Sequence, residues 1–199
     1  MSDLLFYAPI LTISFFVFLY SFWKNLKDDY IPSQIFSTAF FTIFLFALGL
    51  SLGSYFKIYP FWLSVLGLVI GYTIGTARKG IKFYDTFDSV VISSMTSAVF
   101  SIPLLIIFPN AGAVIFYTIL LFSILVFFLI KKHYKGFIWY RSGRRGFAGL
   151  FTFGTFFLLR SIISLIDPGL TIDATIYDVF ISGLISFVSL LNIFVLARR

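Results

Sequence analysis

The stretch AGAVIFYTILLFSILVFFLIKK, residues 111–132, decides the fold class of this chain. Its first twenty residues carry no charged side chain, and two lysines follow at once. A helix of that length matches the hydrocarbon core of a bilayer, about 30 Å thick, because each helical residue rises about 1.5 Å. The stretch therefore predicts a transmembrane helix over residues 112–130.

The composition extends this prediction to all 199 residues. Hydrophobic side chains make up 60% of the chain and charged ones only 12%, with a mean hydropathy of +1.03, whereas a soluble domain carries about 25% charged residues. Apolar runs of similar length recur, each bounded by charges, proline, glycine or asparagine. We expect an all-α polytopic membrane protein with a single integral membrane domain, 1–199. Its seven expected spans are 4–23, 35–54, 60–76, 90–108, 112–130, 147–166 and 179–197.

Positive charge gathers on one side of the predicted membrane. With the N-terminus outside, thirteen of the fifteen Lys and Arg residues fall in cytoplasmic loops or in the C-terminal tail. The outer loops hold Lys57 and four of the eight acidic residues. This asymmetry satisfies the positive-inside rule and predicts an outer N-terminus and a cytoplasmic C-terminus. The net charge of +7 then indicates anionic lipid as a contact, and not nucleic acid.

The residue inventory excludes several kinds of site. The chain has no cysteine, one histidine (His133) and no glutamate, since all eight acidic residues are aspartates. Disulfides, thiolate or multi-histidine metal sites and any mechanism that needs a glutamate are therefore excluded. Motifs of the Ser-His-Asp, HExxH and phosphate-binding glycine-loop kinds are missing too. We expect no metal and no cofactor.

Small residues mark two predicted packing faces. The third span carries glycines at every fourth position, and the fourth span carries serines with the same spacing. Such stripes let helix backbones approach closely, and the serines are also candidates for lining a cavity. The residues are Gly67, Gly71 and Gly75 in the third span and Ser93, Ser97 and Ser101 in the fourth.

Three further polar residues stand out near or inside the spans. Arg160 lies within the sixth span, about 10 Å below its outer end. An intramembrane arginine is a functional candidate, here for an anionic headgroup, because its guanidinium holds a phosphate bidentately. The alternatives are that it reaches the outer headgroups or pairs with Asp167 or another outer aspartate. Asp88 is expected to cap the start of the fourth helix, and Asn192 to make an interhelical hydrogen bond.

Three segments of the chain resemble a known family of membrane enzymes. They are GLVIGYTIGTARKGIKFYDTFDSVVISS (67–94), RRGFAGLFTFGTFFLLRSIIS (144–164) and ISGLISFVSLLNIFVLARR (181–199). In order and spacing they resemble bacterial prolipoprotein diacylglyceryl transferase, which moves a diacylglyceryl group from phosphatidylglycerol to the lipobox cysteine of prelipoproteins. The resemblance implies a bacterial cytoplasmic membrane location, a phosphatidylglycerol ligand and a prelipoprotein lipobox peptide as partner. It also implies substrate binding by Arg160, Phe156 and Ser164.

The chain departs from that family at the positions that carry catalysis. Only PNAG, residues 109–112, separates the fourth and fifth spans, where the family has two more spans with its His-Gly-Gly and Arg-Asn-Glu signatures. Ser164 stands where the family has a glutamate, and Phe156 where it has a tyrosine. No catalytic residue is assigned. Three hypotheses remain open: a divergent transferase, a non-catalytic lipid-binding or partner-binding relative, and a small transporter or channel.

Overall fold

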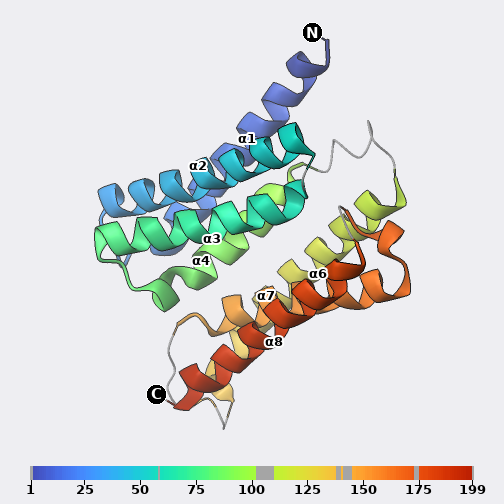
Figure 1. Cartoon of the computed structure of the whole chain (residues 1–199). Coiled ribbons are helices and arrows are strands. Elements are labelled where there is room, and N and C mark those ends of the chain that lie inside the picture. Colours follow the sequence, from blue (N-terminus) through green and yellow to red (C-terminus); the bar gives the residue numbers. More distant parts are fainter. Residues whose placement is uncertain are drawn as a thin grey trace.

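Seven α-helices make up most of the described chain in the computed structural model (Figure 1). The structure describes residues 2–57, 59–101, 110–137, 140, 145–172 and 175–198. The helices are α1 (Ser2–Leu26), α2 (Pro32–Phe56), α3 (Pro60–Lys79), α4 (Phe83–Val99), α6 (Ala111–His133), α7 (Phe147–Ile166) and α8 (Ile176–Arg198), with short 3-10 helices η1 (Tyr134–Gly136) and η2 (Pro168–Leu170).

Six of these helices are long and apolar enough to cross a membrane: α1, α2, α3, α6, α7 and α8. The prediction of a multi-pass, helical membrane protein is therefore confirmed. The other helix, α4, has 17 residues and packs among them. Six of the seven predicted spans lie within the helices observed.

The predicted span 90–108 differs from the helix that the structure describes. α4 begins at Phe83 and ends at Val99, and residues 102–109 lie outside the described part of the chain. Asp88 was expected at the start of this helix, but Asp85 and Asp88 both lie within it. The deeper of the two, Asp88, is tolerated there because backbone amides at the start of α7 donate to its carboxylate.

α2 and α3 form a tight antiparallel pair along the glycine stripe. A Cβ added at Gly67 would collide with the carbonyl oxygen of Leu45, and one at Gly71 with that of Phe41. From the other side, Gly49 of α2 lies equally close to the backbone of Leu63. The structure thus places the glycines where two helix backbones meet, which only residues without a side chain allow.

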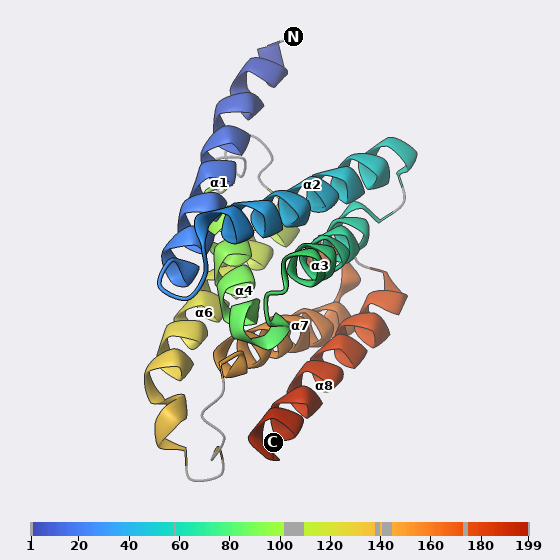
Figure 2. The same cartoon turned by 90° about the vertical axis from the view of Figure 1, so that its left-hand side faces the viewer.

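α4 lies at the centre of the bundle, and the other helices surround it (Figure 2). It packs against α1, α6 and α7, while α8 packs mainly on α7. The buried core unites residues from six helices: Phe22, Ile35, Tyr72, Val90, Leu120 and Phe157. The two ends of the chain lie at opposite ends of the molecule (Figure 1).

Candidate functional site: a buried ion pair and a lateral groove

Arg160 forms a buried ion pair with Asp178. Its Nε and Nη2 donate to Asp178 Oδ1 at 3.2 and 3.0 Å, and Nη2 also donates to the carbonyl of Ile172 at 2.7 Å. The same carboxylate accepts the Trp62 indole N–H at 2.9 Å and the Ser164 hydroxyl at 2.8 Å. We call Arg160, Asp178, Trp62 and Ser164 the Arg160 cluster.

The Arg160 cluster offsets the burial of its two charges by pairing them and surrounding them with hydrogen bonds. The side chains of Arg160 and Asp178 are 1% and 0% exposed, and an unpaired charge at such a place would cost several kcal/mol. The carboxylate accepts four hydrogen bonds, three at Oδ1 and one at Oδ2. The guanidinium carbon also lies 3.9 Å from the centroid of the Phe61 ring, a favourable cation–π distance.

Three helices bring the Arg160 cluster together. Arg160 and Ser164 are one turn apart on α7, and Asp178 lies in the first turn of α8. Trp62 comes from the first turn of α3, which Pro60 begins. The Trp62–Asp178 bond therefore ties α3 to the α7–α8 pair at the end of the bundle where α3 and α8 begin.

The sequence predicted part of this arrangement. Pairing of Arg160 with an outer aspartate was one open alternative, and Asp178 is that aspartate; Asp167 instead accepts the Gly169 amide at 2.8 Å. Ser164 joins Arg160 through the shared carboxylate. Trp62 was missed, because no periodicity links residues on α3 and α8 that meet in space.

Phe156, the third residue expected to bind substrate, packs elsewhere. It is 7% exposed, and its ring lies edge-on to that of Phe116 in α6, with centroids 6.0 Å apart. In this structure the Arg160 side chain is buried and pairs with Asp178, so it does not reach the surface of the protein. Binding of a headgroup phosphate by Arg160 stays a prediction.

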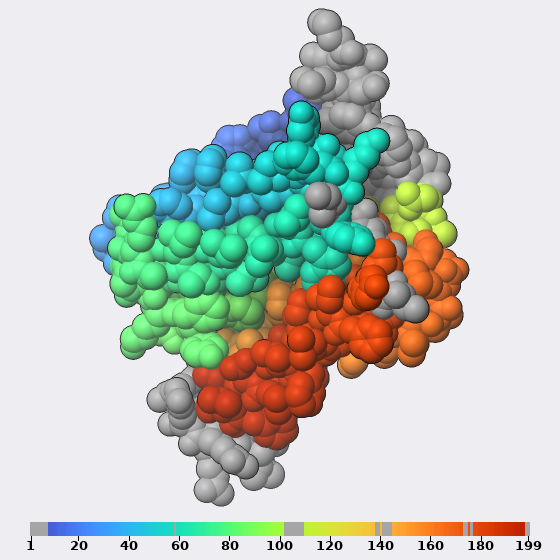
Figure 3. All heavy atoms as spheres, in the orientation of Figure 1, coloured from blue at the N-terminus to red at the C-terminus, as the bar shows by residue number. Residues whose placement is uncertain are grey.

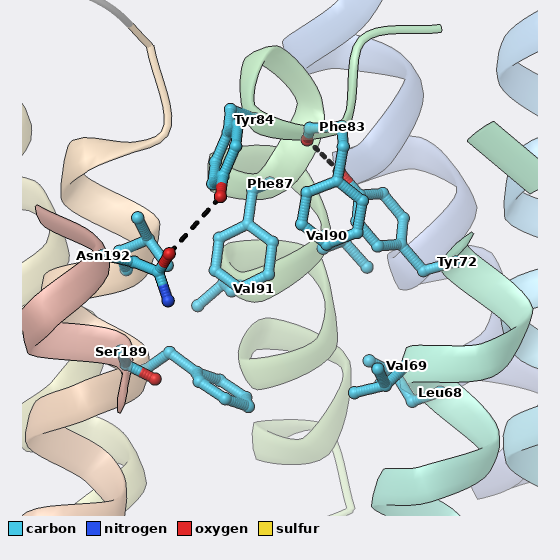
Figure 4. Close-up of a pocket in the computed structure, with 12 residues that line it drawn as sticks. Leu68, Val69, Tyr72, Phe83, Tyr84, Phe87, Val90, Val91, Ser189 and Asn192 are labelled. Carbon is cyan, nitrogen blue, oxygen red and sulfur yellow. Dashed lines mark hydrogen bonds between the residues drawn. The ribbon is translucent and has the colours of Figure 1, made fainter. Parts of the chain in front are cut away.

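A groove runs between α3, α4, α7 and α8 (Figure 4). In the space-filling view, α8 (red) touches α3 (cyan) at one end, and α7 (orange) is visible between them farther along (Figure 3). The groove holds a cavity of about 190 Å³. Its wall is mostly apolar, formed by Leu68, Val69, Phe87, Val90, Val91, Leu150 and Phe153 among others.

One end of the groove carries uncharged polar groups. The Tyr84 hydroxyl, in the first turn of α4, donates to Asn192 Oδ1 in α8 at 3.4 Å, and Ser189 lies one turn farther in (Figure 4). The Asn192 amide also donates to the carbonyl of Val188 at 2.9 Å. The interhelical hydrogen bond expected of Asn192 is therefore present. Tyr84 is 38% and Val69 40% exposed, so the groove opens sideways.

The serine stripe lies away from this groove. Ser97 donates to the carbonyl of Ser14 in α1 at 2.7 Å, and the Ser101 hydroxyl lies 3.4 Å from the Ser14 hydroxyl. Ser93 is 0% exposed. The structure places the stripe mainly at the contact between α1 and α4, and none of its three serines lines the cavity.

Asp88 caps a helix other than the one expected. It lies in the second turn of α4, and its carboxylate accepts the backbone amides of Gly149 at 2.5 Å and Gly146 at 3.3 Å. These amides belong to the start of α7, so the prediction that Asp88 caps its own helix is wrong. Gly146 has φ of 98°, and a side chain there would also meet the carbonyl of Tyr84.

The loop before α7 carries a second ion pair. Arg145 pairs with Asp29 of the α1–α2 loop, and the hydrogen bond to Asp29 raises the pKa of the Arg145 guanidinium. Both side chains are partly exposed, so the pair contributes little stability by itself. It links the loop before α7 to the loop between α1 and α2.

Comparison of the chain with protein-family models, with curated proteins and with solved structures finds no match. The resemblance to diacylglyceryl transferases accordingly remains a prediction from the three quoted segments. Function is therefore inferred from the Arg160 cluster and the groove.

Proposed function

We propose that this chain is a phospholipid-binding membrane protein of the diacylglyceryl transferase type, with phosphatidylglycerol as its ligand. The observation that carries the proposal is the groove between α3, α4, α7 and α8. Three of the four helices that line it, α3, α7 and α8, are long and apolar enough to cross the membrane; its wall is mostly apolar, and it opens sideways. Lipid is the molecule present at high concentration around such an opening, and an acyl chain fits its chemistry.

The proposal includes an orientation in a bacterial cytoplasmic membrane. With the N-terminus outside and α4 as a seventh crossing helix, the helix ends that carry Lys24, Arg78, Lys79, Lys131 and Lys132 face the cytoplasm together. The end of the groove with Tyr84 and Asn192 lies at this same side, because Tyr84 is in the first turn of α4 and Asn192 is near the end of α8. The basic side attracts an anionic lipid such as phosphatidylglycerol.

The non-catalytic alternative has more support than the transferase. Ser164 occupies the place of the family's glutamate and donates a hydrogen bond to Asp178, so it supplies no base. His133, the one histidine, lies at the end of α6 with Nδ1 2.9 Å from the carbonyl of Leu129. Neither group is placed to take a proton in the groove.

The transporter alternative has less support than lipid binding. A polar path through the bilayer needs polar side chains that line a continuous opening. The serine stripe instead contacts α1, and Arg160 forms a buried ion pair with Asp178. In the described part of the chain these groups serve helix packing.

Quantitative lipid extraction tests the proposed function. The protein is purified in a mild detergent from a bacterial membrane, and the lipids that remain bound are counted per chain. We expect phosphatidylglycerol to be enriched over its share in that membrane. A bound-lipid composition equal to that of the bulk membrane would contradict specific binding.

A transfer assay separates the two lipid-binding alternatives. Proteoliposomes with labelled phosphatidylglycerol receive a lipobox peptide, and the diacylglyceryl label on the peptide is followed. We expect no transfer above that of empty liposomes, while a helical far-ultraviolet spectrum shows that the protein is folded. Transfer would establish catalysis with a base that the sequence does not reveal.

A further inference from the structure

We infer that the groove holds one ester-linked acyl chain of a cytoplasmic-leaflet lipid, with the ester carbonyl bound by the Tyr84 hydroxyl. The inference rests on the proposed function and its orientation, and adds the leaflet, the number of chains and the contact that recognises the ligand.

The length of the groove fits one leaflet. Along α4 the lining runs from Phe83 to Val91, about 12 Å of helix. One leaflet contributes about 15 Å of the hydrocarbon core. On α8 and α7, lining residues also lie in the cytoplasmic halves of the helices, at Asn192, Ser189, Leu150 and Phe153.

The size of the cavity allows part of one acyl chain and no more. Its volume of about 190 Å³ is below the range of about 300–1,000 Å³ that pockets for whole small molecules occupy. A complete diacyl lipid therefore does not fit inside. One chain enters the groove, and the rest of the lipid stays in the surrounding bilayer.

The polar end of the groove suits an ester. None of the lining residues is charged, so the wall itself offers a hydrogen-bond donor and not a counter-ion. The Tyr84 hydroxyl now makes a long bond of 3.4 Å to Asn192 Oδ1, which an ester carbonyl can replace as acceptor. Asn192 keeps the hydrogen bond that its amide N–H donates to the Val188 carbonyl. In the proposed orientation, the first turn of α4 places Tyr84 at the cytoplasmic boundary of the hydrocarbon core, where the glycerol esters of that leaflet lie.

Photo-crosslinking with paired probes tests the contact. One phosphatidylglycerol probe has a photoreactive chain joined by an ester, and the other has the same chain joined by an ether, which lacks the carbonyl. We expect the ester probe to label the groove about three- to tenfold more efficiently, as the loss of one hydrogen bond predicts. Tyr84→Phe should abolish this preference. Equal labelling by both probes in the wild type would overturn the ester contact.

The same ester probe tests where the lipid binds on the protein and from which leaflet it enters the groove. Labelled peptides should come from α3, α4, α7 and α8, and labelling should fall severalfold in Val69→Trp, whose side chain fills the groove. Ile70→Trp, on the lipid-facing side of the same helix, should behave like the wild type. In oriented vesicles, probe confined to the leaflet at the cytoplasmic side should label the groove.

Two outcomes separate this inference from the proposed function. Labelling outside the groove, or only from the outer leaflet, would overturn the inference while lipid binding itself stands. Lack of any bound lipid in the extraction experiment would overturn both.

Discussion

At the scale of single residues, Arg160 and Asp178 are the most consequential pair in this chain. The sequence identified Arg160, because an arginine inside an apolar run is costly. The sequence predicted that an outer aspartate could pair with Arg160, but it did not show which one, since three such aspartates follow Arg160 within twenty residues. Trp62 could not be predicted, because its bond to Asp178 spans 116 residues and joins two helices whose contact no local pattern encodes.

Removing one charge of the Arg160–Asp178 pair should destabilise the protein more than removing both charges. Arg160→Met leaves a buried, unpaired carboxylate, and we expect a loss of about 3–5 kcal/mol in the free energy of unfolding. Arg160→Met combined with Asp178→Asn leaves no charge, and the new amide oxygen still accepts from Trp62. The double variant should be more stable than the single one in thermal unfolding in detergent. A double variant less stable than Arg160→Met would contradict a charge-dominated site.

At the scale of the helices, the sequence predicted the spans well and one helix start badly. Six predicted spans lie within observed helices because uninterrupted apolar runs are long and clear. The predicted start of the fourth span, residue 90, was too late, because Asp88 was expected to cap this helix from outside it and lies in its second turn. What permits Asp88 inside the helix is a pair of amides 58 and 61 residues farther along the chain, which local pattern cannot reveal.

Asp88→Ala should loosen the start of α7. The amides of Gly146 and Gly149 lose their acceptor, and we expect a cost of about 1–2 kcal/mol, as for other helix caps. Hydrogen exchange should accelerate at those two amides first. Asp85→Ala, one turn earlier on α4, serves as the control and should leave the exchange of both amides unchanged.

Gly71→Ala should force α2 and α3 apart. The added methyl group would collide with the carbonyl of Phe41, and overpacking of this kind costs about 1–3 kcal/mol. The expected result is a lower midpoint of thermal unfolding. Ile70→Ala, which removes lipid-exposed surface from the same helix, should change the midpoint much less. Similar effects of the two variants would argue against backbone contact at the glycine stripe.

At the scale of the whole molecule, charge and hydropathy predicted the class of protein and an orientation, but not the groove. Trp62 joins α3 to α8 near the first turns of both helices, and the groove lies where the two helices are farther apart. Such a feature depends on helix crossing geometry, which a single apolar sequence leaves open.

The orientation can be tested cleanly because the chain has no cysteine. A membrane-impermeant maleimide should label Lys57→Cys in intact cells. Lys27→Cys should be labelled only after the membrane is permeabilised. The opposite pattern would reverse the proposed orientation and with it the leaflet from which the groove is filled.

Native mass spectrometry with phosphatidylglycerol tests the central claim, that the lateral groove binds a phospholipid, most directly. Wild type and Ile70→Trp should retain the lipid with equal affinity, and Val69→Trp should bind it at least about tenfold more weakly while keeping the same unfolding temperature, since its indole occupies the space of the acyl chain. Equal affinity in all three proteins would contradict binding in the groove.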